Sequence, residues 1–197
     1  MTGRTALAAG AVLVAAMLVG CGGSSSGGAQ SSAPNPNGQE VSPAGDIPDN
    51  QAFVRYAPPG GNYSVKVPEG WARKKVGTAV VFTDKLNAVR MESVAAPRAL
   101  SVAAARRTVV AALGASLKDF APGAVSSVTR PAGTATLIKY QADGAPDPVT
   151  GRVRRDAFER YVFFHAGRQV VLTLSGPKGA DNVDPWKLVT SSLRWTR

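Results

Sequence analysis

The chain of 197 residues contains a single cysteine, Cys21, and a single histidine, His165. A catalytic triad of the Ser-His-Asp or Cys-His kind needs an imidazole as its base, so any such site would have to use His165. This histidine falls at the end of a predicted hairpin, whereas Cys21 follows a short apolar segment near the N-terminus. The residue types therefore predict a protein that is not an enzyme.

The sequence predicts neither a metal site nor a cofactor. Zinc sites use several cysteines or histidines at short spacing, and this chain has one of each. Asp181 and Asp184 could supply oxygen ligands, but their segment lacks the glycine and the distal glutamate of a calcium loop. We expect these two aspartates to cap a helix, and we expect Asp143 and Asp147 to form a polar turn.

The densest basic motif consists of Arg152, Arg154 and Arg155, and Arg160 and four aromatic residues follow it. A guanidinium group pairs with phosphate through two parallel hydrogen bonds, so these arginines form a possible anion-binding site. In the competing interpretation, nearby Asp and Glu side chains neutralise the arginines and the aromatic residues belong to the core. Trp71, Trp186 and Trp195 are likewise expected to anchor the core rather than to form a sugar-binding platform.

The N-terminal segment has the features of a secretory signal. Arg4 precedes an uncharged run, residues 6–19, that is rich in Ala, Val and Leu. A helix that spans a bilayer needs about 20 apolar residues, so this run is too short for a permanent anchor. We expect it to direct export.

The residues Leu18, Val19, Gly20 and Cys21 close this run, and together they resemble the lipobox of bacterial lipoproteins. The resemblance implies that residues 1–20 are removed as a signal peptide and that Cys21 becomes an acylated N-terminus. Two acyl chains hold a protein stably on a membrane. The predicted location is the extracytoplasmic face of the cell membrane. The alternative is an ordinary cleaved signal with a chance cysteine.

Composition divides the rest of the chain into a tether and a domain. Residues 21–50 are rich in Gly, Ser and Pro and contain no Lys or Arg, which predicts a flexible tether. Residues 51–197 have the length of one domain, and their 22 Lys and Arg against ten Asp and Glu give a formal charge of +12. Such a charge favours anionic partners, namely lipid headgroups, acidic wall polymers or an acidic envelope protein. Predicted export argues against nucleic acid.

Hydrophobic periodicity predicts strands at residues 63–67, 79–83, 89–93, 134–141, 156–164 and 168–174. A hairpin is expected from the first strand through Pro68 and Gly70 into the basic segment 73–75, within a meander of about four strands. Helices are expected at residues 102–115, capped by Ser101, and from Asp184, with Pro185 in its first position. Strands joined in sequence and covered by helices predict an α+β fold with an antiparallel sheet.

Three segments carry a second resemblance. They are the Pro-x-Gly-Trp turn within residues 63–71, Val-Phe-Thr-Asp-x-x-Asn at residues 81–87, and the closing segment 175–195. Together they resemble PsbP-like domains, which implies an α/β/α sandwich over residues 51–197 and an interaction role without catalysis. The resemblance carries over no catalytic residue.

The sequence therefore predicts a membrane-anchored envelope lipoprotein whose domain is a non-catalytic binding or scaffold module with a basic surface. The alternative is a carrier or accessory of lipid or glycolipid transport. That role requires an apolar cavity between sheet and helix, and the Ala-rich helix at residues 102–115 could leave one.

Overall fold

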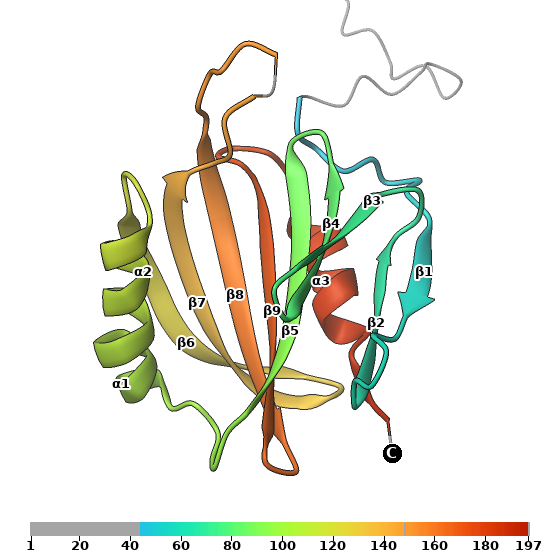
Figure 1. Cartoon of the computed structure of the whole chain (residues 1–197), viewed down its shortest axis with the longest axis vertical. Helices are drawn as coiled ribbons and strands as arrows, with labels where there is room; N and C mark the ends of the chain where they lie inside the picture. The colour runs from blue at the N-terminus through green and yellow to red at the C-terminus, as the bar shows by residue number, and fades with distance from the viewer. Residues whose placement is uncertain (1–43, 148, 197) are drawn as a thin grey trace, which may run out of the picture. The chain divides into compact units, whose positions relative to one another are not determined.

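A computed structural model describes residues 44–147 and 149–196 (Figure 1). Cys21 and the other residues of the predicted lipobox lie outside the described residues, as does most of the predicted tether. The strands are β1 (Phe53–Tyr56), β2 (Tyr63–Pro68), β3 (Ala72–Val76), β4 (Ala79–Asp84), β5 (Asn87–Ala95), β6 (Ala121–Arg130), β7 (Gly133–Asp143), β8 (Arg155–His165), β9 (Arg168–Pro177) and β10 (Arg194–Trp195). The helical segments are α1 (Val102–Ala104), the π-helical η1 (Ala105–Val109), α2 (Val110–Ser116) and α3 (Val183–Ser191).

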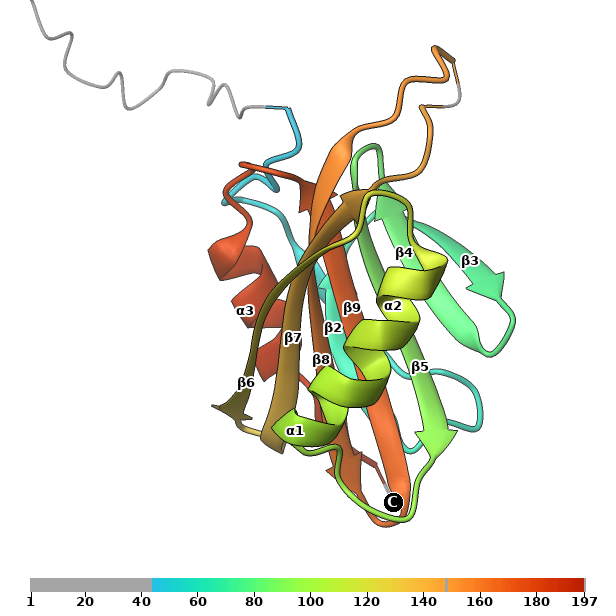
Figure 2. The same cartoon turned by 90° about the vertical axis from the view of Figure 1, so that its left-hand side faces the viewer.

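Seven strands form one antiparallel sheet in the order β3-β4-β5-β9-β8-β7-β6, and β1-β2-β10 form a small second sheet. The helical stretch α1-η1-α2 lies on one face of the large sheet, and α3 lies on the other (Figure 2). This arrangement confirms the predicted α+β fold, an antiparallel sheet flanked by helices.

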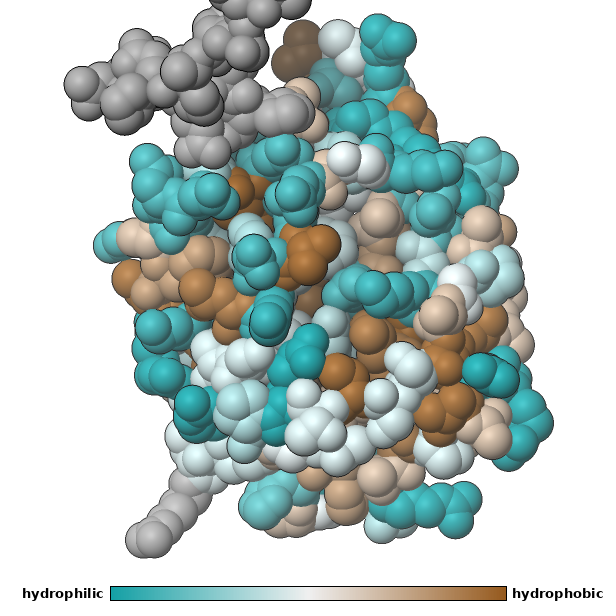
Figure 3. All heavy atoms as spheres, turned by 180° about the vertical axis from the view of Figure 1, so that it is seen from behind, coloured by the Kyte–Doolittle hydropathy of each residue, from teal (hydrophilic) through white to brown (hydrophobic). Residues whose placement is uncertain are grey.

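A cluster of hydrophobic side chains packs on each face of the large sheet. On the α3 side, β2 contributes Tyr63, Val65 and Val67, which pack with strand residues such as Met91 and Leu172. On the α2 side a smaller cluster forms, whose buried members are Ala105, Val125, Ile138, Tyr140 and Ala142. Seen from the α3 side, the surface shows hydrophobic groups scattered among hydrophilic ones (Figure 3).

The predicted hairpin between residues 63–67 and 73–75 is wrong. β2 pairs with β1 and β10, whereas β3 pairs with β4 in the large sheet. The turn at Gly70, with φ of +80°, therefore carries the chain from one sheet to the other. The partners of β2 come from opposite ends of the domain, and no local pattern in the sequence reveals such pairing.

The strands β7, β8 and β9 confirm the strands predicted at residues 134–141, 156–164 and 168–174. β6 was not predicted. It is an edge strand whose register shifts between Pro122 and Val125, and Pro and Gly at such an irregularity resemble a loop in sequence.

The first predicted helix and its cap are confirmed, since Ser101 Oγ accepts a hydrogen bond from the Ala104 backbone N at 3.2 Å. The predicted start of the last helix is wrong. α3 begins at Val183 with Asn182 as its N-cap residue, and Asp184 lies inside its first turn. The predicted packing face is confirmed, because Val189 and Leu193 are buried.

The Asn182 side chain does not cap the helix, because it binds the segment that precedes β1. Its Oδ1 accepts from the Ile47 backbone N at 2.8 Å, and its Nδ2 donates to the Gly45 carbonyl at 3.0 Å. Ile47 is 5% exposed. The packed domain thus includes residues that composition assigned to the tether, and it begins before residue 51.

Among the described residues, none of the helices combines the length and the apolar character needed to cross a bilayer.

Candidate binding surface

Few of the basic side chains have an acidic partner. Within the described part of the chain, the ion pairs use only three acidic residues. Glu92 pairs with Arg90 and Arg160, Glu159 pairs with Lys139, and Asp156 lies beside Arg154. Most of the excess positive charge predicted from the sequence is therefore not neutralised by neighbouring carboxylates.

Arg73 and Lys75 are basic residues that form no ion pair with another described residue. Both line a cavity of about 570 Å³ at the edge of the large sheet. We call it the β3 pocket. Its other walls include Tyr56, Pro58, Pro59 and Val80. The pocket thus combines two positive charges with an aromatic ring, two proline rings and an aliphatic side chain.

The register of β3 explains why the two cations face the same way. Arg73 lies opposite Phe82 and Lys75 opposite Val80 on β4. Alternate residues of a strand point to the same face of the sheet, so Arg73 and Lys75 share the face of Phe82 and Val80. The intervening Lys74 points to the opposite face.

The opposite wall comes from the connection between β1 and β2. Its prolines restrict the backbone, and the Gly61 backbone N donates to the Pro58 carbonyl at 2.8 Å. Tyr56 packs edge-to-face against Phe82, with ring centroids 5.0 Å apart. The Arg73 guanidinium lies 5.6 Å from the centre of the Tyr56 ring. Tyr56 therefore connects the small sheet to the cations of the large one.

This arrangement suits an anionic group attached to an apolar or ring-shaped body. Arg73 and Lys75 are exposed, and neither belongs to an ion pair among the described residues. Their N–H groups are thus available for phosphate or carboxylate oxygens. Proline, tyrosine and valine side chains offer apolar contact beside them.

The sequence-predicted arginines are arranged differently. Arg152 is exposed in the β7–β8 connection, whereas Arg155 begins β8 and donates to the Asp119 carbonyl. The Arg154 Nε lies 3.9 Å from the Asp156 Oδ1. These contacts direct Arg154 and Arg155 to different partners, and anion binding by the three arginines stays a prediction.

The acidic residues near these arginines have structural roles. Asp147 Oδ1 accepts hydrogen bonds from the backbone N of Thr150 and of Val149, and these bonds lower the pKa of Asp147. The polar turn predicted for residues 143–147 is wrong in its position, because Asp143 ends β7 and the turn follows Asp147. Asp156 is buried, which raises its pKa, and Arg154 opposes this effect.

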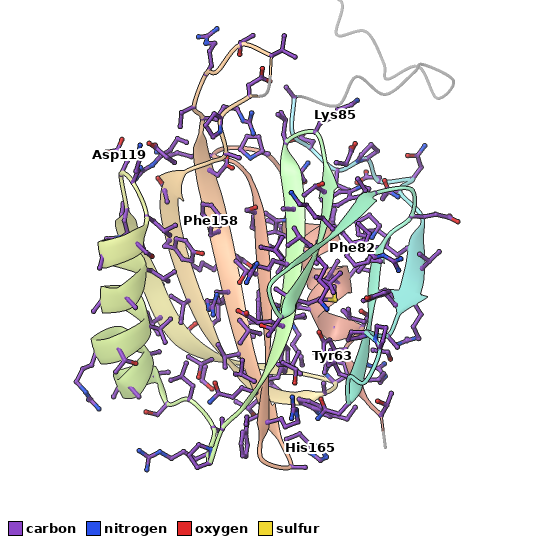
Figure 4. All side chains as sticks on the ribbon, viewed as in Figure 1. Tyr63, Phe82, Lys85, Asp119, Phe158 and His165 are labelled. Atoms are coloured by element: carbon purple, nitrogen blue, oxygen red, sulfur yellow. The ribbon has the colours of Figure 1, made fainter. Side chains whose placement is uncertain are left out.

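His165, the three tryptophans and two aromatic residues of β8 lie in the positions that the sequence predicted. His165 is exposed at the β8–β9 turn, far along the hairpin from Phe158 (Figure 4), and its ring stacks on Trp195 at 5.0 Å. The three tryptophans are partly buried against the core, as expected. Tyr161 and Phe163 are buried, which confirms the core interpretation for these two aromatic residues. No group of three His, Cys, Asp or Glu in residues 44–147 and 149–196 could hold a metal ion.

A second hollow, of about 360 Å³, lies between the helical stretch and the large sheet. We call it the α2 hollow. Val109, Ala112 and Leu113 line it from the helical side and Arg160 from the sheet. Much of the space between helix and sheet is nevertheless filled by the cluster around Ile138 and Tyr140.

The sequence pattern places residues 73–75 in a hairpin with residues 63–67 and does not reveal the β3 pocket. The available signal was the alternation of basic residues in a predicted strand, because Arg73 and Lys75 must share a face. No signal in the sequence connected Tyr56 with them, since the two segments belong to different sheets.

No protein-family model matches the chain, and no curated protein matches it in sequence. Its fold is similar to that of cyanobacterial PsbP (CyanoP) from Synechocystis sp. PCC 6803, with a TM-score of 0.51 and 16% identity over 79% of this chain and 98% of that one. The Ran-binding protein Mog1p of Saccharomyces cerevisiae gives a TM-score of 0.50 and 11% identity over 74% of this chain and 96% of that one.

A third structure, LpqN of Mycobacterium tuberculosis, described as involved in cell envelope biogenesis, gives a TM-score of 0.42 and 14% identity over 76% of this chain and 87% of that one. At this TM-score the likeness carries no argument about function. The identities to all three proteins are low, so the comparisons bear on the fold alone. That fold is PsbP-like.

Proposed function

We propose that this protein is a lipoprotein of the cell envelope whose domain binds an anionic envelope component without catalysing a reaction. The observation that carries the proposal is the β3 pocket. There Arg73 and Lys75 converge beside the apolar surfaces of Tyr56, Pro58 and Pro59, and neither has an acidic partner among the described residues.

The pocket favours a partner with phosphate or carboxylate groups. Each Lys or Arg near an anionic surface contributes about 1 kcal/mol to binding. Two cations in one pocket therefore contribute more binding free energy to the same ligand than an isolated cation does. The formal charge of +12 on residues 51–197 adds an attractive field, which salt screens over about 8 Å at physiological ionic strength. Anionic lipid headgroups and acidic wall polymers both meet these requirements.

The proposed anchor is lipid on Cys21, at the extracytoplasmic face of the cell membrane. The sequence around Leu18 and Cys21 supports it, and the predicted tether would let the domain reach the membrane surface or the wall. A domain held near its ligand binds at a raised effective concentration, so modest affinity in the β3 pocket would suffice.

Lipidation is tested with Cys21→Ala in the producing cell. We expect the variant to leave the membrane fraction or to accumulate unprocessed, and we expect metabolic labelling with a tagged palmitate to mark only the parent chain. A second variant, Ser24→Ala, alters the neighbouring segment without removing the thiol and should be labelled normally. Membrane retention of a processed Cys21→Ala chain, or palmitate labelling of that variant, would refute the anchor.

Binding is tested on the chain with Cys21→Ser, which cannot be acylated, by cosedimentation with phospholipid vesicles. We expect binding to vesicles that contain phosphatidylglycerol, little binding to pure phosphatidylcholine, and a steep loss of binding between low and high salt. Equal binding to both vesicles, or binding that salt does not change, would contradict an electrostatic role.

A further inference from the structure

A row of polar and charged side chains crosses the middle of the large sheet, on the face that carries α2. Arg160 on β8 lies opposite Thr173 on β9, which in turn lies opposite Arg90 on β5. Glu92, two residues along β5, shares this face with Arg90. The row occupies the central strands β5, β9 and β8, whereas the helical stretch contacts β6 at the edge of the sheet.

Glu92 holds both arginines. Its Oε1 lies 3.4 Å from Arg160 Nη2 and its Oε2 lies 3.2 Å from Arg90 Nη2. Arg160 Nη1 also donates to Thr173 Oγ1 at 3.2 Å. One carboxylate thus serves two guanidinium groups, and the row keeps an excess positive charge.

This charge is sheltered from solvent. The side chains of Arg160 and Glu92 are 22% and 16% exposed, and the Arg160 Nε is buried without a hydrogen-bond partner. An unpaired buried donor is destabilising, and more so when it carries charge. The fold therefore keeps a cation, Arg160, that is only partly neutralised because its carboxylate partner Glu92 also pairs with Arg90.

The α2 hollow lies directly beside this cation. Its helical wall offers the aliphatic groups of Val109, Ala112 and Leu113, and the wall includes the end of the π-helical segment η1. Single π-helical turns within α-helices occur often at functional sites. The hollow has a volume of about 360 Å³ and is open to solvent, since Thr108, Ala112 and Ser116 in its lining are exposed.

We infer that the α2 hollow binds the anionic head and adjoining carbon chain of a single-chain amphiphile. A carboxylate or phosphate oxygen pairs with the Arg160 guanidinium where it lines the hollow, and the chain packs against Val109, Ala112 and Leu113. This site is independent of the β3 pocket. Arg160 shares a face with Arg90, whereas Arg73 and Lys75 share the opposite face with Phe82.

The inference is tested by calorimetry on the Cys21→Ser chain with decanoate, decyl phosphate, decanol and acetate. Decanoate and decyl phosphate should compete for one site. Decanol, which lacks the charge, should bind at least tenfold more weakly, because a hydrogen bond to a charged group contributes about 1.5–3 kcal/mol. Acetate, which lacks the chain, should also bind at least tenfold more weakly. Decanol or acetate binding as tightly as decanoate would overturn the inference.

Two variants locate the site. Arg160→Gln should lower decanoate affinity at least tenfold and leave decanol unchanged. Ala112→Phe fills the hollow from an exposed helix position and should abolish the binding of decanoate and of decanol. This variant leaves the charged row unchanged, so it tests the site even if Arg160→Gln does not fold. Ala115→Phe, also exposed on α2 but outside the lining, is the matched control and should bind as the parent does.

Failure of this site and failure of the proposed function give different results. Arg73→Gln with Lys75→Gln should lose vesicle binding and keep decanoate binding. Unchanged decanoate affinity in both Arg160→Gln and Ala112→Phe, or the absence of binding at millimolar decanoate, would overturn the inference while the vesicle result stands by itself.

Discussion

Two basic segments look alike in sequence, Arg73-Lys74-Lys75 and Arg152-Val153-Arg154-Arg155, yet the fold uses them in opposite ways. In the first, strand alternation directs Arg73 and Lys75 to one face, where they meet Tyr56 across a cavity. In the second, Arg154 lies beside Asp156 and Arg155 donates to the Asp119 carbonyl. Convergence and the lack of a local counter-charge distinguish a candidate site from a basic stretch of chain.

The two basic segments also differ in what they are expected to contribute, one to the stability of the fold and the other to ligand binding. Arg155 holds the start of β8 to the loop that follows α2, so it connects segments of the fold. Arg73 and Lys75 are exposed and make no ion pair with another described residue. We therefore expect the first pair of cations to matter for ligands and the second segment to matter for folding.

The strongest test of this comparison removes two charges from each segment. Arg73→Ala with Lys75→Ala should weaken binding to phosphatidylglycerol vesicles about 30-fold, since each cation contributes about 1 kcal/mol at an anionic surface. Arg152→Ala with Arg155→Ala removes the same charge and should weaken binding to these vesicles less than about threefold. Cosedimentation at physiological salt measures both, and equal losses would mean that net charge alone drives binding.

The reverse pattern is expected for stability. Arg155→Ala should lower the free energy of unfolding by about 1 kcal/mol, because it removes a charge-assisted hydrogen bond to a backbone carbonyl. Arg73→Ala should change it by less than about 0.5 kcal/mol, as is usual for an exposed position. Urea unfolding compares the two variants. A larger loss in Arg73→Ala would show that the β3 pocket is structural.

A smaller effect on vesicle affinity is expected from the aromatic ring of Tyr56, as distinct from its apolar bulk. Tyr56→Leu keeps an apolar side chain but removes the ring beneath Arg73. Vesicle affinity should fall about twofold to fivefold, which corresponds to a cation–π contribution of about 0.5–1 kcal/mol. Tyr56→Phe retains the ring and is the matched control. If both variants bind as the parent does, the ring takes no part in positioning Arg73.

The smallest predicted effect concerns pH. Burial raises the pKa of Asp156 above its unfolded value of about 3.9, so the folded chain binds this proton more tightly than the unfolded chain does. Stability should therefore fall as pH rises from the unfolded to the folded pKa, and Asp156→Asn should remove that decline.

Asp147→Asn is the control of opposite sign. Hydrogen bonds from Thr150 lower the pKa of Asp147, so its contribution is present above the unfolded pKa and is lost as pH falls through the folded one. Urea unfolding between pH 3 and pH 7 measures both slopes. If the free energy of unfolding depends on pH in Asp156→Asn as it does in the parent, the decline does not come from the raised pKa of Asp156.

Much of the fold was predictable because local patterns report local structure. Alternation in residues 134–141, 156–164 and 168–174 predicted three central strands, and Ser101 before an apolar stripe predicted a helix and its cap. β1, β6 and β10 were missed because they are short or lie at an edge, where few side chains are buried and the pattern is weak. The start of α3 was misplaced because Asn182 makes tertiary rather than capping contacts.

The amino-acid sequence by itself determined the central strands, the helices, the excess of positive charge and the prediction of a lipid on Cys21. Only the tertiary structure decided that the chain divides between two sheets at Gly70, that Tyr56 lies beside Arg73, and that Arg160 lies beside Glu92 and the α2 hollow. Periodicity states which face of a strand is buried, but it does not state which strands are neighbours. Neighbours are selected by the burial of hydrophobic side chains over the whole domain, and sites made from several strands are therefore revealed by the fold.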